Sequence, residues 1–474
     1  MAGRGQPRHV VCRSGKDGRD MNGRGKLERL LCEQLLIFDG AMGTMLQGLG
    51  LKGGDLAEKY NLERPEVIAG IHRAYVEAGA QAVTTNTFSA NRFKLAGSGL
   101  DLAAVIKAAV EIARKAAADR LVALDVGPLG QLMEPYGTLS FETAYEAFAE
   151  QIRAGAAAGA DLVLVETMSD LYEAKAAVLA ARENTDLPVF CTMTFQANGR
   201  TLTGADPMTV VNVLQSLGVD ALGINCSLGP EEVAPLMEAM LRYAQVPIMV
   251  QPNAGLPQLL GNETVFPVMP AEFAAYGCGM AAKGARILGG CCGTTPAHIE
   301  ALKHALAGTK SVSITVPRLQ MASSGRTTVT FEDEATLLCG RIHPGTDQQL
   351  ADALCRGDLD YLIQEALDQQ DDGAAILDVN VAVPGIDEKA AVVDVVKAIQ
   401  GIVKLPLMIS SSNPEVIEKA ARIYNGRLII NTAGRDAPFL TAIKPIVRKY
   451  GCLAAAPDLT AVVPRLTKAD IIDV

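Results

Sequence analysis

The chain has 474 residues, of which 49% are hydrophobic and 20% are charged, and this balance excludes disorder as its dominant state. No stretch of 18 or more uncharged apolar residues occurs in it, so we expect no membrane span. The net charge of −10 argues against nucleic acid as a main partner, because phosphate binding needs a basic surface.

The first segment, residues 1–32, is rich in Gly, Arg and Lys and lacks a periodic apolar pattern. We expect a disordered or artefactual tail there, with a basic interaction arm as the alternative. The ten cysteines of the chain are too sparse for a disulfide framework, and no secretory apolar region precedes them. A reducing, cytoplasmic location is therefore the expectation.

Residues 33–307 alternate between short apolar runs and Ala-rich stretches of helical period. Nearly continuous apolar strands are typical of a parallel sheet that is covered on both faces. Helical stretches such as 66–78 and 144–158 are each followed by a glycine in a C-cap position. Eight such units predict an α/β fold with a (β/α)8 TIM barrel, and a doubly wound open sheet is the alternative. The eight strand candidates are residues 35–38, 81–85, 121–124, 162–165, 188–192, 221–224, 247–250 and 286–288.

A linker rich in Ser, Thr, Lys and Arg is expected at residues 308–330, before a second α/β domain at residues 331–474. Helical patterns at residues 348–370 and 413–424 separate its strands. Only five strand candidates are found, at residues 336–339, 374–377, 406–409, 428–430 and 452–455. They predict an incomplete second (β/α) barrel-like domain. Because an open sheet edge favours aggregation, we expect this domain to be truncated, completed by another chain, or closed in some other way.

Polar or thiol groups follow most strands of the first domain at their carboxyl ends, which is where barrel active sites lie. The residues at these strand ends are Asp39, Asn86, Asp125, Glu166, Cys226, Asn253, Cys291 and Cys292. We therefore expect them to converge on one mouth of the barrel.

The three cysteines Cys226, Cys291 and Cys292 are the most informative of these residues, because they follow the sixth and eighth strands. Three thiolates plus one open position suit a catalytic zinc ion. Adjacent cysteines rarely pair with each other, since a vicinal disulfide is strained. Burial in the core is the alternative for this trio. Core packing is also the expected role of the remaining cysteines, which are Cys12, Cys32, Cys191, Cys278, Cys339, Cys355 and Cys452.

Zinc held by three thiolates is electron-rich and suits the binding of a fourth thiol from a substrate, which the ion deprotonates. The thiolate is the nucleophilic form of a thiol. The trio thus predicts alkyl transfer to a thiol substrate, with no catalytic residue needed beyond the zinc ligands.

The runs Phe38-Asp39-Gly40-Ala41-Met42-Gly43-Thr44, Thr85-Asn86-Thr87-Phe88, Glu166-Thr167, Gly223-Ile224-Asn225-Cys226 and Gly289-Gly290-Cys291-Cys292-Gly293 resemble the homocysteine S-methyltransferase family. The sequences of these motifs are most similar to those of the homocysteine-binding modules of cobalamin-dependent methionine synthases. This resemblance implies a transferase that takes part in methionine biosynthesis.

The resemblance also implies the roles of single residues. Cys226, Cys291 and Cys292 are implied to ligate zinc, and Asp39, Gly40, Ala41 and Glu166 to hold the amino-acid end of homocysteine. Asn253 is expected near the metal, where it can fill the open position in the absence of substrate. Asn86 is a further substrate-binding candidate, and its alternative role is to satisfy the backbone of its own loop.

The second domain resembles the pterin-binding, or methyltetrahydrofolate, module of the same enzymes. The resemblance is carried by Asp378-Val379-Asn380-Val381, Pro384-Gly385-Ile386-Asp387, Ser411-Ser412-Asn413 and Ile430-Asn431. It implies Asp378, Asn380 and Asn431 as pterin contacts. Two departures argue against folate binding by this chain alone. Gly340-Arg341-Ile342-His343 lacks the family's Glu and has His for Asn, and Ser410 stands where an Asp is usual. We expect His343 to be a solvated loop residue.

Together these observations predict an enzyme that binds homocysteine as its thiolate and methylates it to methionine. No Asp-x-His-x-x-Gly run of a cobalamin module is found, so a separate methyl-corrinoid protein is expected to supply the methyl group. Another small donor, such as S-methylmethionine or betaine, is one alternative. A non-catalytic zinc-binding remnant of such an enzyme is the other.

Overall fold

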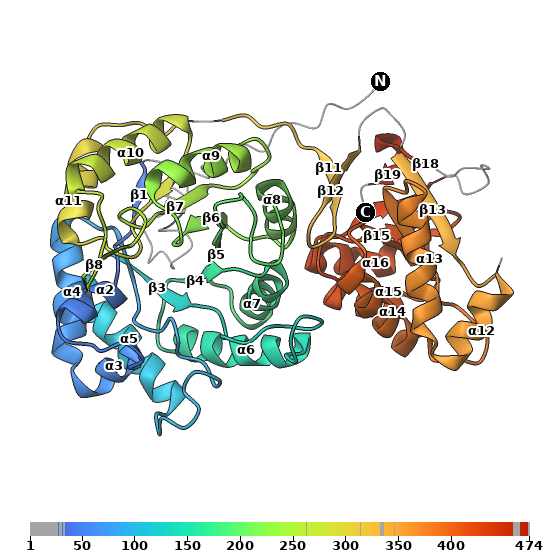
Figure 1. Cartoon of the computed structure of the whole chain (residues 1–474), viewed down its shortest axis with the longest axis horizontal. Helices are drawn as coiled ribbons and strands as arrows, with labels where there is room; N and C mark the ends of the chain where they lie inside the picture. Colours follow the sequence, from blue (N-terminus) through green and yellow to red (C-terminus); the bar gives the residue numbers. More distant parts are fainter. Residues whose placement is uncertain are drawn as a thin grey trace. The chain divides into compact units, whose positions relative to one another are not determined.

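The computed structural model describes residues 27, 31, 34–261, 263–312, 314–331, 336–345, 347–457 and 465–472. They group into two compact units (Figure 1). The first contains the barrel and most of the chain up to Pro317. The second contains Arg318 onward, together with residues 133–138 and 203–218.

Eight parallel strands form the sheet of the first unit and confirm the predicted barrel. In the sheet the strands lie in the order β1, β10, β7, β6, β5, β4, β3, β2. Each strand therefore neighbours the next one along the chain, as in a TIM barrel, apart from the added hairpin β8–β9. Their bounds are β1 (Leu36–Ile37), β2 (Ala82–Thr84), β3 (Leu121–Val126), β4 (Leu162–Met168), β5 (Val189–Met193), β6 (Ala221–Asn225), β7 (Ile248–Gln251) and β10 (Ile287–Leu288).

The barrel closes between β1 and β2 through a single parallel bridge, which joins Phe38 to Ala82. Side chains extend this short seam. Gln81 accepts a hydrogen bond from the backbone N–H of Ile37 at 2.9 Å, and the carboxylate of Asp39 accepts one from the N–H of Thr84 at 2.8 Å. The carboxylate of Asp39 thus accepts a hydrogen bond from β2 that a backbone carbonyl would accept in a regular strand pair.

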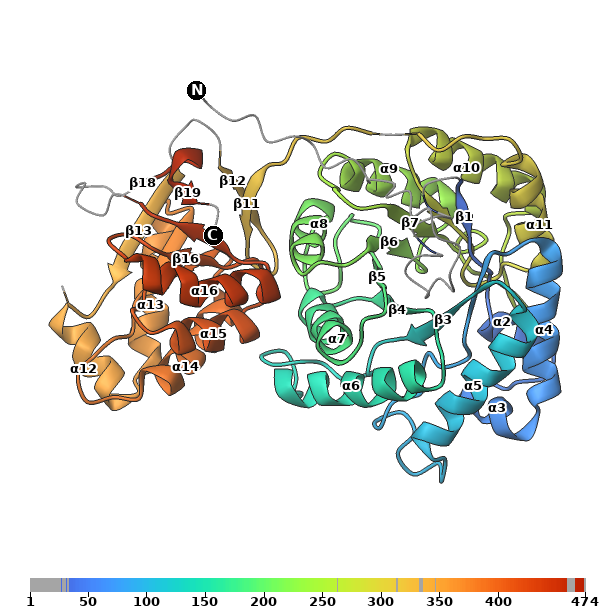
Figure 2. The same ribbon diagram turned by 180° about the vertical axis from the view of Figure 1, so that it is seen from behind.

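Helices surround the strands of the barrel (Figures 1 and 2). Several begin at a side-chain cap, as at Asp101, Ser140 and Asp170, each of which accepts a hydrogen bond from the first turn. The helix over 65–78 ends at Gly79, where φ is +104°. The helices of the first unit are α2 (Gly43–Gly48), η1 (Ala57–Lys59), α3 (Tyr60–Glu63), α4 (Pro65–Ala78), α5 (Leu102–Ala117), α6 (Phe141–Ala157), α7 (Leu171–Asn184), α9 (Pro230–Leu241), α10 (Pro270–Lys283) and α11 (Pro296–Ala305). The helix α8 (Pro207–Ser216), which follows β5 in the chain, belongs to the second unit.

The interior of the barrel is filled by apolar side chains that the strands contribute in turn, among them Phe38, Leu164 and Phe190. Leu27 and Leu31 also belong to this core, with 3% and 6% of their surface exposed. The predicted tail at residues 1–32 is therefore wrong at these two positions, because their side chains are buried against the barrel. The rest of that segment lies outside the described residues.

Two hairpins were not expected from the sequence. The loop after β7 carries β8 (Gln258–Leu260) and β9 (Glu263–Val265), which pair in antiparallel fashion. A second hairpin, β11 (Gln320–Ser323) and β12 (Thr328–Phe331), occupies the end of the predicted linker. Ala322 and Phe331 of this hairpin are buried in the core of the second unit. The linker at 308–330 is thus shorter than predicted, since its last residues are part of a folded core.

The second unit contains a seven-stranded sheet in the order β18, β13, β14, β15, β16, β17, β19. Its five parallel strands are those expected, at β13 (Thr336–Ile342), β14 (Ile376–Val379), β15 (Leu407–Ile409), β16 (Ile429–Asn431) and β17 (Leu453–Ala455). The antiparallel strands β18 (Arg465–Leu466) and β19 (Ile471–Ile472) pair with β13 and β17. Both edges of the parallel sheet are therefore covered within the chain, which is the third of the expected alternatives.

The helices of this unit are α12 (Gln348–Arg356), α13 (Leu359–Asp371), α14 (Glu388–Ile402), α15 (Pro414–Ile423), α16 (Ala437–Tyr450) and η2 (Lys468–Asp470). The single helix predicted at 348–370 is in fact two. Gly357, with φ of +65°, ends α12, and Asp358 caps the start of α13. Glycine tolerates this left-handed conformation, so the helix ends there.

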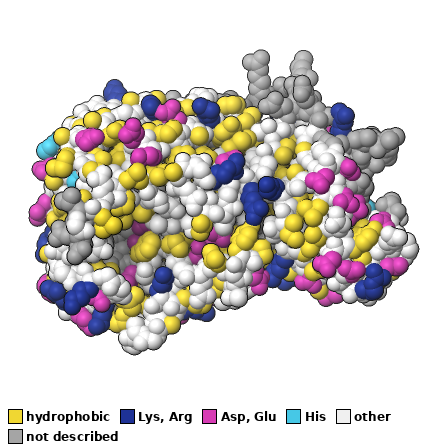
Figure 3. Space-filling view, viewed as in Figure 1, with side chains coloured by type: hydrophobic (Ala, Val, Ile, Leu, Met, Phe, Trp, Pro, Cys, Tyr) yellow, Lys and Arg dark blue, Asp and Glu magenta, His cyan; other side chains and the backbone are white. Residues whose placement is uncertain are grey.

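Charged and apolar side chains are mixed on the described surface. On the face shown in Figure 3, the described Lys and Arg residues lie in small groups among acidic and apolar side chains. Among the described helices, none is long and apolar enough to cross a membrane. Of the cysteines expected in the core, Cys191 and Cys452 are buried, but Cys355 is exposed and Cys278 is partly exposed. Cys12 and Cys32, and the side chain of Cys339, lie outside the described part of the chain.

Candidate active site

A cavity of about 420 Å³ opens at the carboxyl ends of the barrel strands. All but one of the residues predicted for the first domain's site line it, and the exception is Asn253. The lining residues from that prediction are Asp39, Gly40, Ala41, Asn86, Glu166, Cys226, Cys291 and Cys292. The cavity therefore gathers residues from both ends of a 270-residue segment.

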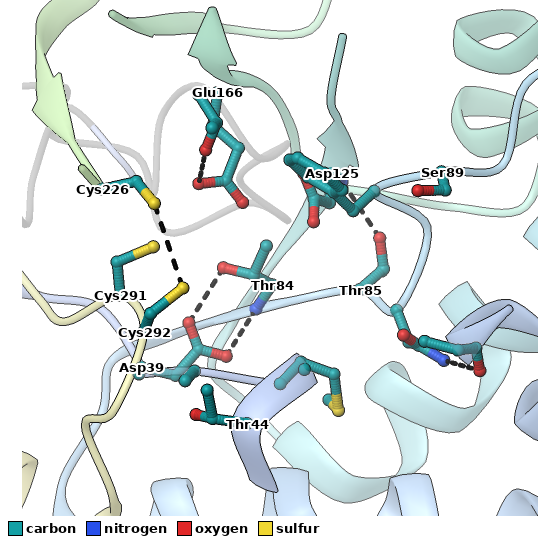
Figure 4. Close-up of a pocket in the computed structure, with 18 of the residues that line it drawn as sticks. Asp39, Thr44, Thr84, Thr85, Ser89, Asp125, Glu166, Cys226, Cys291 and Cys292 are labelled. Carbon is teal, nitrogen blue, oxygen red and sulfur yellow. Dashed lines mark hydrogen bonds between the residues drawn. The ribbon is translucent and has the colours of Figure 1, made fainter. Parts of the chain in front are cut away.

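Three thiols form one wall of this cavity (Figure 4). The sulfur atoms of Cys226, Cys291 and Cys292 all lie within 4.8 Å of one another, and Cys226 Sγ is 3.9 Å from Cys292 Sγ. Each thiol is partly exposed. The trio is thus not part of the packed core, and the alternative of buried structural cysteines is not supported.

Hydrogen bonds within the trio separate the acidities of its thiols. Those from Cys226 and then Cys291 lower the pKa of Cys292 to about 3, whereas the same network raises the pKa of Cys291. Hydrogen bonds from its two neighbours therefore favour the thiolate form of Cys292 over that of Cys291.

The backbone around the cysteines is held in special conformations. Gly293 has φ of +79°, and a Cβ at Gly290 would lie 2.4 Å from Oγ1 of Thr294, so this tight turn needs both glycines. Thr294 Oγ1 donates to the carbonyl of Cys291 at 2.7 Å. Cys226 itself has φ of +59°. The two turns direct three thiols from β6 and β10 toward one point.

The structure assigns Asp39 a role at the seam as well as in the cavity. Its two carboxylate oxygens accept hydrogen bonds from Thr84, at 2.8 Å from the N–H and 2.9 Å from the hydroxyl (Figure 4). Burial raises the pKa of Asp39 to about 7, although the hydrogen bonds from Thr84 lower it. Ala41, which the resemblance implies to hold the amino-acid end of homocysteine, donates its N–H to Thr294 Oγ1 at 3.1 Å.

Glu166 and Asp125 form a pair of carboxyl groups on the wall of the cavity, and Asp125 is buried while Glu166 is partly exposed. Burial raises the pKa of Glu166 to about 7, and hydrogen bonding with Asp125 lowers it. Burial and then the charge of Glu166 raise the pKa of Asp125. None of the described residues that line the cavity is Lys, Arg or His. The site therefore favours a cationic group at the carboxylates and a metal ion at the thiols.

Asn86 lines the cavity, but its side chain also holds the loop that follows β1. Its Nδ2 donates to the carbonyl of Ala57 at 2.8 Å and to Oδ1 of Asn61 at 3.0 Å. Glu58, which the sequence analysis did not single out, lies in the same loop and accepts a hydrogen bond from the N–H of Ser89 at 2.6 Å. Glu58 lies on the 3-10 helix η1 and does not follow a strand, so no sequence pattern marks it as a residue of the cavity.

Asn253 lies in the segment after β7 that joins the cysteine turn. The N–H of Cys291 donates to the carbonyl of Pro252, and the N–H of Ala254 donates to that of Cys292. Oδ1 of Asn253 is buried and has no hydrogen-bond partner among the described residues. Three soft thiols within 4.8 Å of one another fit a tetrahedral metal site with one open position.

The strand ends of the second unit bring together two of the three predicted pterin contacts. Ser410 donates to Oδ1 of Asp378 at 2.6 Å, and Nδ2 of Asn431 donates to Ser410 Oγ at 2.7 Å. Burial raises the pKa of Asp378 to about 6. Asn380 is not in this cluster. Its Oδ1 accepts a hydrogen bond from the N–H of Ala382, and its Nδ2 lies 3.1 Å from Nε2 of His343. His343 is partly buried rather than fully solvated.

A model of the family described as "Homocysteine S-methyltransferase" matches residues 36–306, which is more than half of the chain. The chain belongs to the homocysteine S-methyltransferase family. A second model, "Pterin binding enzyme", matches residues 342–456. The family predicted from the sequence motifs is thereby confirmed for the barrel, and the second unit is confirmed as a pterin-binding fold.

Known relatives are similar to this chain over different lengths. Methionine synthase of Mycobacterium tuberculosis is 33% identical over 432 residues, which cover 86% of this chain and 36% of the relative. Methionine synthase of Mycobacterium leprae is 31% identical and is covered to 38%. The chain thus spans less than two fifths of these relatives. The metallated form of the homocysteine methyltransferase MmuM from Escherichia coli is 31% identical with a TM-score of 0.51, and covers 59% of this chain and 98% of its own.

Proposed function

We propose that the barrel methylates homocysteine to methionine, with a zinc ion held by Cys226, Cys291 and Cys292. The observation that carries the proposal is the convergence of three thiols and two carboxyl groups, Asp39 and Glu166, on one cavity. Thiols suit a soft metal and a thiol substrate, and carboxylates suit an α-ammonium group. Homocysteine carries both of these groups on one short chain.

The metal site is proposed to be zinc because its donors are three thiols. When bound, zinc would lower the pKa of the homocysteine thiol and keep it as the nucleophilic thiolate. Asn253, whose buried Oδ1 has no hydrogen-bond partner among the described residues, would be a further candidate to hold the ion in the absence of substrate. Support for a metal comes also from the metallated relative described above.

The residues of this chain then orient the substrate. Glu166 would accept a hydrogen bond from the α-ammonium group. Because burial beside Asp125 raises the pKa of Glu166, ionising this pair of carboxyl groups is costly, and the positive charge of the ammonium group would offset that cost. Asp39 would face the same end of the substrate while Thr84 fixes its carboxylate. The backbone turn that starts at Gly40 would receive the α-carboxylate. The thiolate attacks the methyl carbon, and the donor departs with the electrons of the broken bond.

The donor is proposed to be a methyl-corrinoid protein distinct from this stretch of chain. Two alternatives from the sequence analysis remain to be tested against it: a small donor, S-methylmethionine or betaine, and a non-catalytic remnant. In the second unit, Ser410 stands where the family's aspartate is usual, so its cluster offers a single carboxylate, Asp378, to a pterin. Folate is therefore not the proposed donor.

The experiment is a direct assay of methionine formation. Zinc-loaded protein is incubated with L-homocysteine and one donor at a time: methyl-corrinoid protein, methylcobalamin, methyltetrahydrofolate, S-methylmethionine or betaine. We expect turnover with the corrinoid donors, and its loss together with bound zinc in Cys291→Ala. Turnover with a small donor alone would replace the proposed donor. No turnover with any donor would favour the remnant.

A further inference from the structure

The strand that carries Glu166 is irregular at this residue. The register between β4 and β5 shifts between Val165 and Met168, so Glu166 and Thr167 form a β-bulge. Thr167 has φ of +57°, a left-handed conformation that is rare for a β-branched residue. Bulges beside active sites redirect side chains, and they leave backbone groups without a ladder partner.

Asn225, the last residue of β6, supplies the missing partner. Its Oδ1 accepts a hydrogen bond from the N–H of Thr167 at 2.8 Å, which fixes the orientation of the amide. Its Nδ2 then faces Glu166 and donates to Oε2 at 2.5 Å, and to Thr167 Oγ1 at 2.7 Å. Thr192 on the intervening strand β5 donates to the same Oδ1 at 2.7 Å.

Asn225 is fully buried and makes hydrogen bonds through both ends of its amide. It also directly precedes Cys226, one of the three clustered thiols. Two adjacent residues therefore contact both ends of the proposed substrate site. Cys226 belongs to the thiol cluster, and the side chain of Asn225 holds Glu166, which would bind the other end of the substrate. A shift of β6 would move both ends together.

From this geometry we propose that Asn225 is a positioning residue that orients Glu166 toward the α-ammonium group and so selects amino-acid thiols over thiols that lack the amine. This inference rests on the proposed function, because it takes homocysteine as the substrate and Glu166 as its anchor. The bulge presents the carboxylate, and the Asn225 amide holds the bulge and the carboxylate at once. An aspartate at position 225 would keep the acceptor for Thr167 but would set an oxygen against Glu166.

The test compares the binding of L-homocysteine with that of 4-mercaptobutyrate, which has the same thiol and carboxylate but no amine. Isothermal titration calorimetry on zinc-loaded full chain gives Kd for both ligands without a methyl donor. A charge-assisted hydrogen bond corresponds to a preference of roughly 10- to 100-fold. We expect wild type to prefer homocysteine by this factor, and Asn225→Ala and Asn225→Asp to lose most of it. The affinity of both variants for 4-mercaptobutyrate should stay within about threefold of wild type.

Two controls separate positioning from folding. Thr192→Val removes a neighbouring hydrogen bond to the same amide but leaves the donor to Glu166, so the preference should be retained. Glu166→Gln should lose the preference by itself, and adding Asn225→Ala to it should cause no further loss, because both changes remove one interaction. Zinc content per chain, measured on every variant, should stay at the wild-type value.

The outcomes are distinct. If Glu166→Gln loses the preference and the Asn225 variants keep it, the inference is wrong and the proposed function stands. If the Asn225 variants lose affinity for both ligands equally, or lose zinc, the residue has only a structural role and the inference is also wrong. If wild type binds neither ligand, the proposed function fails, and the inference fails with it.

Discussion

Replacing Tyr75 by Phe removes one hydroxyl that joins two parts of the cavity. Tyr75 lies on α4 with 1% of its surface exposed. Its hydroxyl is 2.9 Å from the carbonyl of Ala41 and 3.1 Å from that of Thr294. Burial raises the pKa of Tyr75, so the hydroxyl stays protonated and donates at all ordinary pH values. It therefore ties the turn beside Asp39 to the turn that carries the cysteines.

The expected cost follows from what the change leaves behind. Two carbonyls lose a shared donor in a site where water has little access, and a stranded buried acceptor costs about 1–3 kcal/mol. We expect Tyr75→Phe to lower the free energy of unfolding by about 2 kcal/mol, which corresponds to a fall of about 4–8 °C in the Tm of the barrel. The turn at Gly40 and Ala41 also becomes less fixed, so the Kd for homocysteine should rise by about 3- to 10-fold.

Urea denaturation, followed by circular dichroism, and calorimetric titration with homocysteine measure the two effects. Tyr276→Phe is the matched control, because Tyr276 is a partly exposed tyrosine on α10. It should change neither quantity appreciably. A Tyr75→Phe protein with the stability and the homocysteine affinity of this control would refute the proposed coupling between the two turns.

Three other perturbations have definite expected outcomes. Zinc at a thousandfold excess over its Kd should stabilise chelator-treated protein by about 4 kcal/mol in thermal unfolding, and Cys292→Ser should abolish this response; an unresponsive wild type would contradict the metal site. Burial raises the pKa of Glu173 to about 7, so its ionisation destabilises the fold as pH rises from 4.5 to 7. Glu173→Gln should therefore add about 3 kcal/mol of stability at pH 8 and nothing at pH 4 in urea titrations, whereas equal effects at both pH values would show the charge to be irrelevant. Ser410→Ala removes a hydrogen bond that lowers the pKa of Asp378, so this carboxyl should titrate above about 6 by NMR, and an unchanged titration would exclude the contact.

The barrel and its thiols could be predicted because their signals are local in the sequence. Apolar runs of strand length mark each strand; Cys226 follows β6 directly, and Cys291 and Cys292 follow β10 after two glycines. In a barrel the carboxyl ends of the strands meet at one face, so strand-end residues converge whatever their separation along the chain.

Other features depend on contacts that no local pattern encodes. Glu58 reaches the cavity from a 3-10 helix through a hydrogen bond to the backbone of Ser89. Asn225 lies at the end of an apolar run, and its side chain bonds to a bulge on another strand. The hairpin at 320–331 has short strands of mixed polarity, which resemble a linker until Ala322 and Phe331 are seen to be buried. These features required the pairing of distant segments to be known.

The seam between β1 and β2 limits how the substrate pocket can be altered. Asp39 closes the sheet through Thr84 and also lines the cavity, so a library at this position selects for folding before it selects for a new ligand. Most substitutions would prevent the barrel from folding, so the few variants that bind the amino-acid end of the substrate differently would be difficult to find. Directed evolution of this barrel should therefore leave Asp39 fixed, or vary it only together with Thr84.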